Sequence, residues 1–302
     1  MSDVPYHPET LYQCNGVTLA CDSFGDKSHP PVLLVMGLAT QLIHWDEQFC
    51  RQLAAQGYWV IRFDNRDIGK SEHLHHLKLP NLIKLAGKHF FNTQFTPPYS
   101  LQDMADDAIA LMDTLRIPKA HVVGVSMGGM ISQLIAIHYP ERVQSLTSIM
   151  SAPGDKKLLK PTPRMSLFMM KPPPANRTQH IAHTINMWRL LHGKHYPFEE
   201  ERVHRIVTTS LKRGFSPKGV MRQLSAIVSA EDRTQKLTQL KLPSLIFHGE
   251  NDPLVPVANG IATAQSIPGA KLTIVKGMGH TIPTPVWPQI VDEFQNMVGE
   301  MR

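Results

Sequence analysis

The chain has 302 residues, of which 42% are hydrophobic and 19% are charged. This balance is ordinary for a globular enzyme, and it excludes a disordered or fibrous protein. The 31 Lys and Arg exceed the 25 Asp and Glu by only six and are spread along the sequence, so we expect no nucleic-acid partner. The length is typical of one α/β core that carries an insertion.

Three cysteines, Cys14, Cys21 and Cys50, cannot all pair in disulfides. A tight turn at Asn15-Gly16 places Cys14 opposite Val17 instead of Cys21, which favours a reducing compartment. The first residues lack a basic segment that leads into an apolar stretch, and no apolar run approaches the ~18 residues of a membrane span. We therefore expect a soluble cytoplasmic protein without a membrane span.

Short apolar runs alternate with helical patterns along most of the chain, which predicts an α/β protein with a mostly parallel sheet. The Asn15-Gly16 turn predicts an antiparallel hairpin at one edge. The expected strands are Leu11–Cys14, Val17–Phe24, Pro31–Met36, Tyr58–Phe63, Ala120–Val123, Ser145–Met150, Ser244–Phe247 and Lys271–Val275. The expected core helices are Trp45–Gln56, a helix capped by Ser100 that runs to Leu115, the helix after Val123, and Gln289–Val298.

The pattern changes between Asp155 and about Ala230, where prolines are followed by three helical segments and no strand pattern. These helices are expected near Thr178–Leu191, Phe198–Leu211 and Pro217–Ala230. An insertion between two sheet strands cannot continue the sheet, so we expect it to pack across the top edge as a lid. The sequence thus predicts a core of residues 1–154 and 231–302 with a helical lid at 155–230.

The stretch from Val122 to Met130 contains the pattern G-x-S-x-G at Gly124, Ser126 and Gly128. An apolar strand precedes this pattern and a helical pattern follows it, so Ser126 is expected on a sharp strand-to-helix turn. The helix directs its N-terminal N–H groups at the same spot, which favours an anion beside the serine. A glycine-rich turn with an ordinary serine fits the motif alone equally well, so the decision depends on partner residues elsewhere.

Two more polar loops follow strands later in the sequence. Asp252 lies in the loop after Leu245–Phe247, and His280 lies in the loop after Lys271–Val275. The carboxyl ends of parallel strands meet at one edge of a sheet, so Ser126, Asp252 and His280 can converge there. The chain order Ser, Asp, His is characteristic of one architecture. Asp155, which follows an earlier strand, is the reserve acid.

At this point the chain resembles the lidded α/β-hydrolases of the esterase, cofactor-free haloperoxidase and aclacinomycin-methylesterase-like group. The matching pieces are Val32–Gly37, residues 64–71, Gly124–Gly129, Gly249–Pro256 and Gly277–His280. The resemblance implies an eight-stranded, mostly parallel sheet flanked by helices. It also implies Ser126 as the nucleophile, Asp252 as the acid, His280 as the base, and the N–H groups of Leu38 and Met127 as oxyanion donors. Many members have His-Gly where this chain has Met36-Gly37, which leaves the support of that loop open.

These residues favour a serine carboxylic-ester hydrolase, because a neutral histidine can activate the serine hydroxyl and an ionised aspartate can orient the histidine. A serine at this turn argues against dehalogenase and epoxide-hydrolase chemistry. The alternatives are a cofactor-free haloperoxidase or perhydrolase, a thioesterase, a C–C bond hydrolase, or a ligand-binding protein without turnover. We expect no cofactor and no metal site, a small-molecule ester as substrate, and a possible homo-oligomer.

The predicted lid also carries an apolar stretch next to a basic one. We expect most of its apolar side chains to dock the lid onto the core and some to form a deformable roof for uncharged, short to medium acyl chains. These side chains are Met165, Leu167, Phe168, Met169, Met170, Met187 and Trp188. The basic residues Lys156, Lys157, Lys160 and Arg164 precede this run and are expected on the solvent side.

Overall fold

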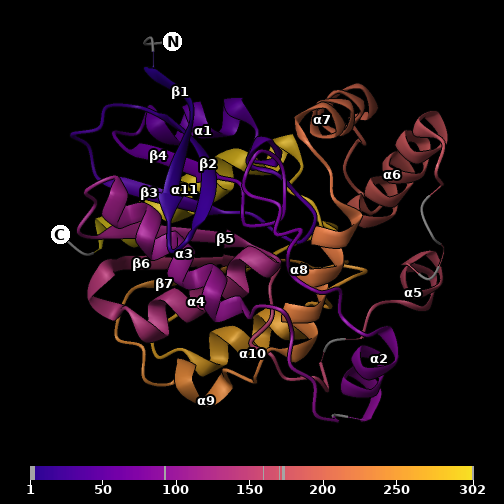
Figure 1. Cartoon of the computed structure of the whole chain (residues 1–302). Helices are drawn as coiled ribbons and strands as arrows, with labels where there is room; N and C mark the ends of the chain where they lie inside the picture. The colour runs from indigo at the N-terminus through magenta and orange to yellow at the C-terminus, as the bar shows by residue number, and fades with distance from the viewer. Residues whose placement is uncertain (1–3, 92, 159, 170, 172–173, 301–302) are drawn as a thin grey trace.

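The computed structural model describes residues 4–91, 93–158, 160–169, 171 and 174–300. Its centre is one eight-stranded sheet in the order β1-β2-β4-β3-β5-β6-β7-β8 (Figure 1). β1 and β2 form an antiparallel edge, and all later strands are parallel, as the sequence predicts. The strands are β1 (Tyr6–Cys14), β2 (Val17–Phe24), β3 (Pro31–Val35), β4 (Trp59–Phe63), β5 (Ala120–Val125), β6 (Val143–Ile149), β7 (Ser244–Gly249) and β8 (Lys271–Val275).

Helices cover the sheet and fill the interval between β6 and β7. They are α1 (Glu47–Ala54), α2 (Leu82–Phe91), α3 (Leu101–Thr114), α4 (Met127–His138), α5 (Pro163–Met169), α6 (Arg177–His192), α7 (Glu200–Arg213), α8 (Pro217–Ser229), α9 (Thr234–Leu237), α10 (Ala258–Ser266) and α11 (Trp287–Gly299). Three short 3-10 helices are η1 (Leu42–His44), η2 (Pro140–Arg142) and η3 (Thr284–Val286).

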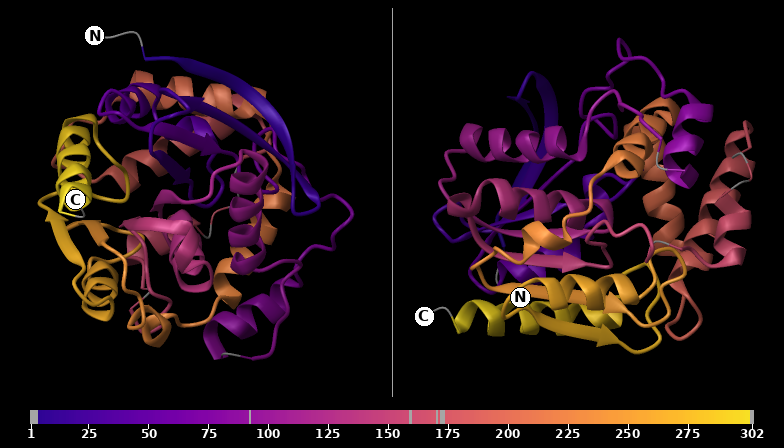
Figure 2. Two further views of the ribbon diagram at one scale, coloured as in Figure 1. Left: turned by 90° about the vertical axis from the view of Figure 1, so that its left-hand side faces the viewer. Right: turned by 90° about the horizontal axis from the view of Figure 1, so that it is seen from below.

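The sheet is buried on both faces, which explains why its central strands are continuous apolar runs. In β3, Val32 and Leu34 belong to one hydrophobic cluster, together with residues of α1 and α11. Leu33 and Val35 point the other way, into a second cluster with residues of α3, α4 and α9. Successive side chains of β3 therefore pack against opposite helical layers, one on each face of the sheet. Both layers are visible in Figure 2.

Several local predictions are confirmed. The hairpin places Cys14 opposite Val17, and all three cysteines are buried thiols. Ser100 caps α3, and its hydroxyl and the carboxylate of Asp103 form a reciprocal capping box. Most strand limits differ from the expected ones by one or two residues, which is the usual uncertainty at element ends.

One strand and several helices differ from the expectations. β1 begins at Tyr6 instead of Leu11, because this edge strand is mostly exposed and its polar residues give no apolar signal. α2, α5, α9 and α10 were not expected as helices. α5 starts at Pro163 inside a proline-rich stretch that resembles a loop, yet proline is well suited to the first position of a helix.

Residues 155–230, termed here the helical insertion, contain α5 to α8 and no strand among the residues the structure describes. Buried ion pairs join it to the turn of residues 64–71. Arg222 of α8 makes two hydrogen bonds to Asp67, at 2.6 and 2.8 Å, with both side chains fully buried. Arg213 of α7 pairs with Asp64 at 2.6 Å and also with Glu9. The insertion is therefore fixed to the core at its α7 and α8 side.

No helix among the described residues is long and apolar enough to cross a membrane.

The buried pair gives a stability prediction. Arg222→Met leaves the Asp67 carboxylate buried without its partner, so the free energy of unfolding should fall by about 3–5 kcal/mol. Arg189→Met is the matched control, because the Arg189–Glu200 pair is largely exposed, and it should cost less than about 1 kcal/mol. Urea unfolding at pH 7 measures both values. Equal losses in the two variants would show that the Asp67 pair does not anchor the insertion.

Candidate active site

Ser126 lies at the sharp turn between β5 and α4, with a φ of 57° and a ψ of −120°. This backbone conformation needs glycines on both sides. A Cβ atom on Gly124 would lie 2.2 Å from the carbonyl oxygen of Gly128, and one on Gly128 would lie 2.1 Å from that of Val35. The Ser126 N–H donates to the carbonyl of Ile149 at 2.9 Å, which holds the turn on β6. The G-x-S-x-G spacing is therefore a steric requirement of this turn.

Asp252 lies in the loop after β7, where its side chain is fully buried. Its Oδ1 accepts the N–H groups of Leu254 and Val255, at 2.9 and 2.8 Å, and its Oδ2 lies 2.6 Å from Nδ1 of His280. Burial alone disfavours the charged carboxylate. The attraction and hydrogen bonds of His280 and His248 outweigh burial and lower the pKa of Asp252 to about 2. Asp252 is consequently ionised at neutral pH.

His280 connects the other two residues. Its Nδ1 faces Asp252, and its Nε2 lies 3.0 Å from the Oγ of Ser126. The His280 main-chain N–H donates to the carbonyl of Leu191, at the end of α6, at 2.6 Å. A Cβ atom on Gly279 would lie 2.1 Å from that same carbonyl oxygen. The helical insertion thus contacts the loop that carries His280.

The structure brings Ser126, Asp252 and His280 together and leaves the reserve acid elsewhere. Asp155 accepts the N–H of Lys157 at 2.9 Å within a turn, whereas the imidazole of His280 faces Asp252. Glu250 is exposed and accepts the N–H of Gly277 at 3.0 Å, so it braces the His280 loop from outside. The acid at the histidine is Asp252.

The loop after β3 lies directly beside Ser126. A Cβ atom on Gly37 would be 3.2 Å from the Cβ of Ser126, which is tighter than an ordinary van der Waals contact, so the glycine lets this loop approach the serine closely. Leu38 follows Gly37, and Met127 is the first residue of α4. Their N–H groups therefore belong to the two segments that flank Ser126.

Two residues that the sequence did not reveal support this loop. Asn65 Nδ2 donates to the carbonyl of Met36 at 2.9 Å. The Ala39 N–H donates to Oε1 of Gln223 at 3.1 Å, and the amide nitrogen of Gln223 donates to the carbonyl of Arg66 at 2.8 Å. Gln223 belongs to α8 and is fully buried. No local pattern could identify it, because its partner Ala39 is 184 residues away in sequence.

His248, at the end of β7, is a buried neighbour of Asp252. Its Nε2 lies 2.8 Å from the carbonyl of Val255 and 3.5 Å from Oδ2 of Asp252. A carbonyl can only accept, so Nε2 carries the hydrogen. A Cβ atom on Gly260 would lie 2.5 Å from Nδ1 of this ring. His248 therefore packs under the Asp252 loop as a structural residue.

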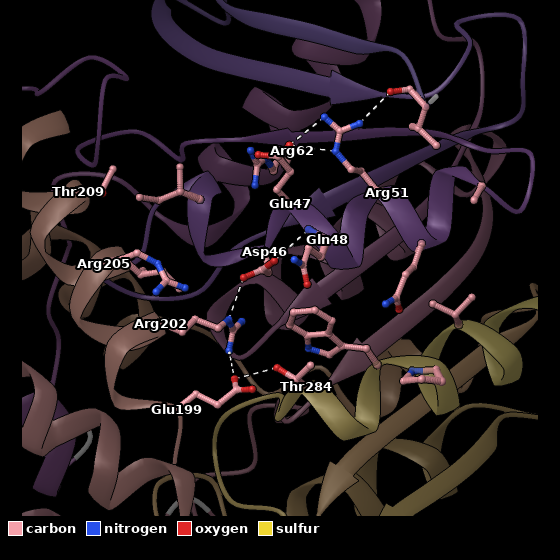
Figure 3. A pocket seen from close by; sticks show the side chains of 18 of the residues that line it. Asp46, Glu47, Gln48, Arg51, Arg62, Glu199, Arg202, Arg205, Thr209 and Thr284 are labelled. Carbon is pink, nitrogen blue, oxygen red and sulfur yellow. Dashed lines mark hydrogen bonds and ion pairs between the residues drawn. The ribbon is translucent and has the colours of Figure 1, made fainter. Parts of the chain in front are cut away.

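No group of three or more His, Cys, Asp and Glu side chains in the described part of the chain could hold a metal ion. A separate open groove, of about 1670 Å³, lies between α1, α7 and α11 and contains none of Ser126, Asp252 and His280 (Figure 3). In that groove Arg202 bonds Asp46 at 2.8 Å and Glu199 at 3.1 Å, and Glu199 accepts the hydroxyl of Thr284. These groups satisfy one another and join α7 to the core.

The depressed pKa of Asp252 predicts a pH dependence of stability. An unfolded aspartate titrates near ~3.9, so the lower native pKa stabilises the fold at pH values above about 4. This contribution, about 2–3 kcal/mol, is lost as the pH falls toward 2. Urea unfolding should show wild type more stable than Asp252→Asn at pH 5, and the difference should fall below about 1 kcal/mol at pH 2.5. A difference that stays constant between these pH values would contradict the depressed pKa.

Comparison with known proteins adds to this geometry. Rhodomycin D methylesterase DauP of Streptomyces sp. (strain C5) is 27% identical over 300 residues, which cover 92% of this chain and 94% of that protein. The 3-oxoadipate enol-lactonase 2 of Acinetobacter baylyi is 25% identical over 275 residues, which cover 90% of each chain. The crystal structure of an enol-lactonase from Burkholderia xenovorans LB400 has a TM-score of 0.72 at 21% identity, and covers 96% of this chain and 100% of that one. The family model for the alpha/beta hydrolase fold matches residues 30–283, and the chain therefore belongs to the α/β-hydrolase family.

Proposed function

We propose that this α/β-hydrolase is a serine carboxylic-ester hydrolase that acts through an acyl-enzyme on uncharged short to medium acyl esters. The observation that supports this proposal most is the continuous chain of contacts from Ser126 through His280 to Asp252. The Ser126–His280 distance is 3.0 Å and the His280–Asp252 distance is 2.6 Å. Both are distances at which hydrogen bonds form, and Asp252 is ionised, so the histidine is oriented with its free nitrogen toward the serine.

In the proposed mechanism, the Ser126 hydroxyl attacks the ester carbonyl while Nε2 of His280 takes its proton. The N–H groups of Leu38 and Met127 bind the oxyanion, a contribution of roughly 3–4 kcal/mol per donor in comparable serine hydrolases. His280 then returns the proton to the leaving alcohol, which leaves an acyl group on Ser126. A water molecule, deprotonated by His280, hydrolyses this acyl-enzyme and restores the serine.

The relatives support ester hydrolysis as the reaction class. DauP is a methylesterase, and the Acinetobacter relative is a lactonase, so both names describe attack on a carboxylic ester, open in one case and cyclic in the other. The two relatives share at least nine-tenths of their length with this chain. A common reaction class is therefore the simplest reading of the shared fold.

We also propose that the helical insertion is the lid of this site, over a core of residues 1–154 and 231–302. Among its apolar side chains Met165 is buried and Phe168, Met187 and Trp188 are half-buried, so these four are the best candidates for the pocket roof. Leu167 and Met169 are exposed instead, and Met170 lies outside the described residues. Lys156, Lys157, Lys160 and Arg164 are all exposed, as expected, which favours uncharged substrates in the pocket.

Removal of the Ser126 hydroxyl tests the nucleophile. Ser126→Ala should lower kcat for a p-nitrophenyl ester by roughly 10³-fold or more, while urea unfolding stays close to wild type. Ser132→Ala is a matched control, because its hydroxyl donates to the carbonyl of Gly128 within α4 and should leave kcat within a few-fold. Substantial turnover by purified Ser126→Ala would exclude the proposed nucleophile.

A series of p-nitrophenyl esters from C2 to C16 tests the acyl preference. Each buried methylene contributes at most about 0.8 kcal/mol, so kcat/KM should rise up to about fourfold per carbon until the pocket is full, and then fall. A hemisuccinate ester of similar length serves as the anionic comparison and should react more slowly. A steady rise through C16, or a preference for the anionic ester, would contradict the proposed substrate class.

A further inference from the structure

The basic residues of this chain are unevenly distributed between its parts. Residues 73–102 and 156–198 together contain 11 Lys and Arg and no Asp or Glu. The rest of the chain contains 20 Lys and Arg against 25 Asp and Glu, a net charge of −5. The overall charge of +6 thus combines a strongly positive part with a mildly negative one. We term the two carboxylate-free segments the basic cap.

The fold gathers these two segments at one end of the molecule. α2 comes from the first segment, and α5 and α6 from the second, and two perpendicular views place all three at the end opposite the C-terminus (Figures 1 and 2). The ring of Phe168 in α5 stacks on His183 of α6 at 4.7 Å, and α2 packs against α8. The pKa of Lys156 is lowered, first by burial and second by the nearby positive charge of Lys88 in α2. Positive charges that are far apart in sequence are therefore neighbours in space.

The cap also exposes aliphatic side chains between its charges. Ile83 and Leu167 are 84% and 62% exposed, more than any other large hydrophobic side chain among the described residues. Leu79 and Met169 are about half exposed. Ten of the eleven basic side chains of the cap are exposed, and the eleventh, Lys88, is partly buried. The exposed ones are Lys78, Lys84, Lys156, Lys157, Lys160, Arg164, Lys171, Arg177, Arg189 and Lys194.

We propose that the basic cap is a docking surface for an anionic lipid bilayer. Lysines and arginines attract the negative headgroups, and exposed aliphatic side chains such as Ile83 and Leu167 enter the headgroup–acyl boundary. Both features are needed for interfacial binding, and both are present on the same helices. A nucleic-acid surface is favoured less, because single strands bind through stacked aromatic rings and duplexes through polar contacts, neither of which uses exposed aliphatic groups.

The docked end is also the end that builds the candidate active site. The carbonyl of Leu191, in α6, accepts the N–H of His280, so the cap and the loop of the histidine are in direct contact. A protein held by its cap would place the entrance to the site near the lipid surface. The docking proposal does not depend on ester hydrolysis, because an inactive chain would carry the same charges and apolar groups.

Vesicle binding of the full chain tests the proposal. Vesicles of phosphatidylcholine alone are compared with vesicles that contain 30% phosphatidylglycerol, by co-sedimentation in 0.05 M and 0.5 M NaCl. Wild type should bind the anionic vesicles at low salt, bind the neutral ones weakly, and be released at high salt, since salt screens the attraction. No binding to the anionic vesicles at low salt would overturn the proposal.

Matched variants locate the surface. Lys84→Gln, Lys160→Gln and Lys171→Gln together should weaken the partition coefficient about 100-fold, which is about fivefold per charge. Lys27→Gln, Lys119→Gln and Lys241→Gln together are the control, because these exposed lysines precede β3, β5 and β7 at the opposite edge of the sheet. The control should bind like wild type, and both triple variants should keep wild-type hydrolysis of a soluble ester. Equal loss of binding in the two triple variants would refute a cap-specific surface.

The apolar contribution is tested separately with Ile83→Ser and Leu167→Ser, which change exposed side chains and no charge. The double variant should bind anionic vesicles at least tenfold more weakly. A 20-base-pair DNA duplex at equal phosphate concentration is the competing polyanion. The lipid proposal would be overturned if wild type bound DNA more strongly than anionic vesicles and if Ile83→Ser and Leu167→Ser left vesicle binding unchanged. The basic cap would then be a surface for a nucleic acid.

Discussion

The turn at Ser126 is the constraint on which the rest of the site depends, because a side-chain-bearing residue there is held at a positive φ. Such a conformation costs of order 1–3 kcal/mol, and it persists only where the surroundings determine it fully. Here β5 and α4 fix the two sides of the turn, β6 holds the N–H of Ser126 through Ile149, and Gly124 and Gly128 let three backbone segments meet. The strain exposes the serine hydroxyl at the sheet edge where the histidine and aspartate loops end. The position of the Ser126 hydroxyl relative to His280 therefore depends on this turn.

The helical insertion takes part in this construction. Gln223 holds the loop after β3, and the carbonyl of Leu191 holds the loop after β8. Arg222, the neighbour of Gln223, is fixed by the buried pair with Asp67. A swing of the entire insertion would break that pair and remove the supports of the loops after β3 and β8 at once.

The sequence was sufficient to predict the features that local patterns encode. The apolar runs gave the sheet, the glycine spacing gave the turn at Ser126, and the order of strand ends gave Asp252 and His280. Residues that hold the loops of the site through contacts distant in sequence could not be predicted in this way. Gln223 and Arg222 occupy ordinary helical positions, and their roles arise from Ala39 and from Asp67, which is 155 residues away in the chain. The exposure of single side chains in the insertion could not be predicted either, because an apolar residue such as Leu167 gives the same sequence signal whether it faces the protein or the solvent.

The basic residues are another feature whose arrangement in the fold cannot be read from the sequence. The basic residues look scattered along the chain because the cap is assembled from two segments, one before β5 and one after β6. Folding brings them to one end of the molecule, while the rest of the chain has a net charge of −5, so the net charge of +6 does not convey how uneven the distribution is. A field of this kind orients a protein at a negatively charged surface before any close contact forms.

Because the cap adjoins the loop of His280, the orientation that satisfies the charges is also the one that turns the candidate active site toward the lipid. The uncharged short to medium acyl esters proposed as substrates are also soluble in a bilayer. The preference for such esters and the docking of the cap are therefore two independent expectations that concern the same end of the molecule.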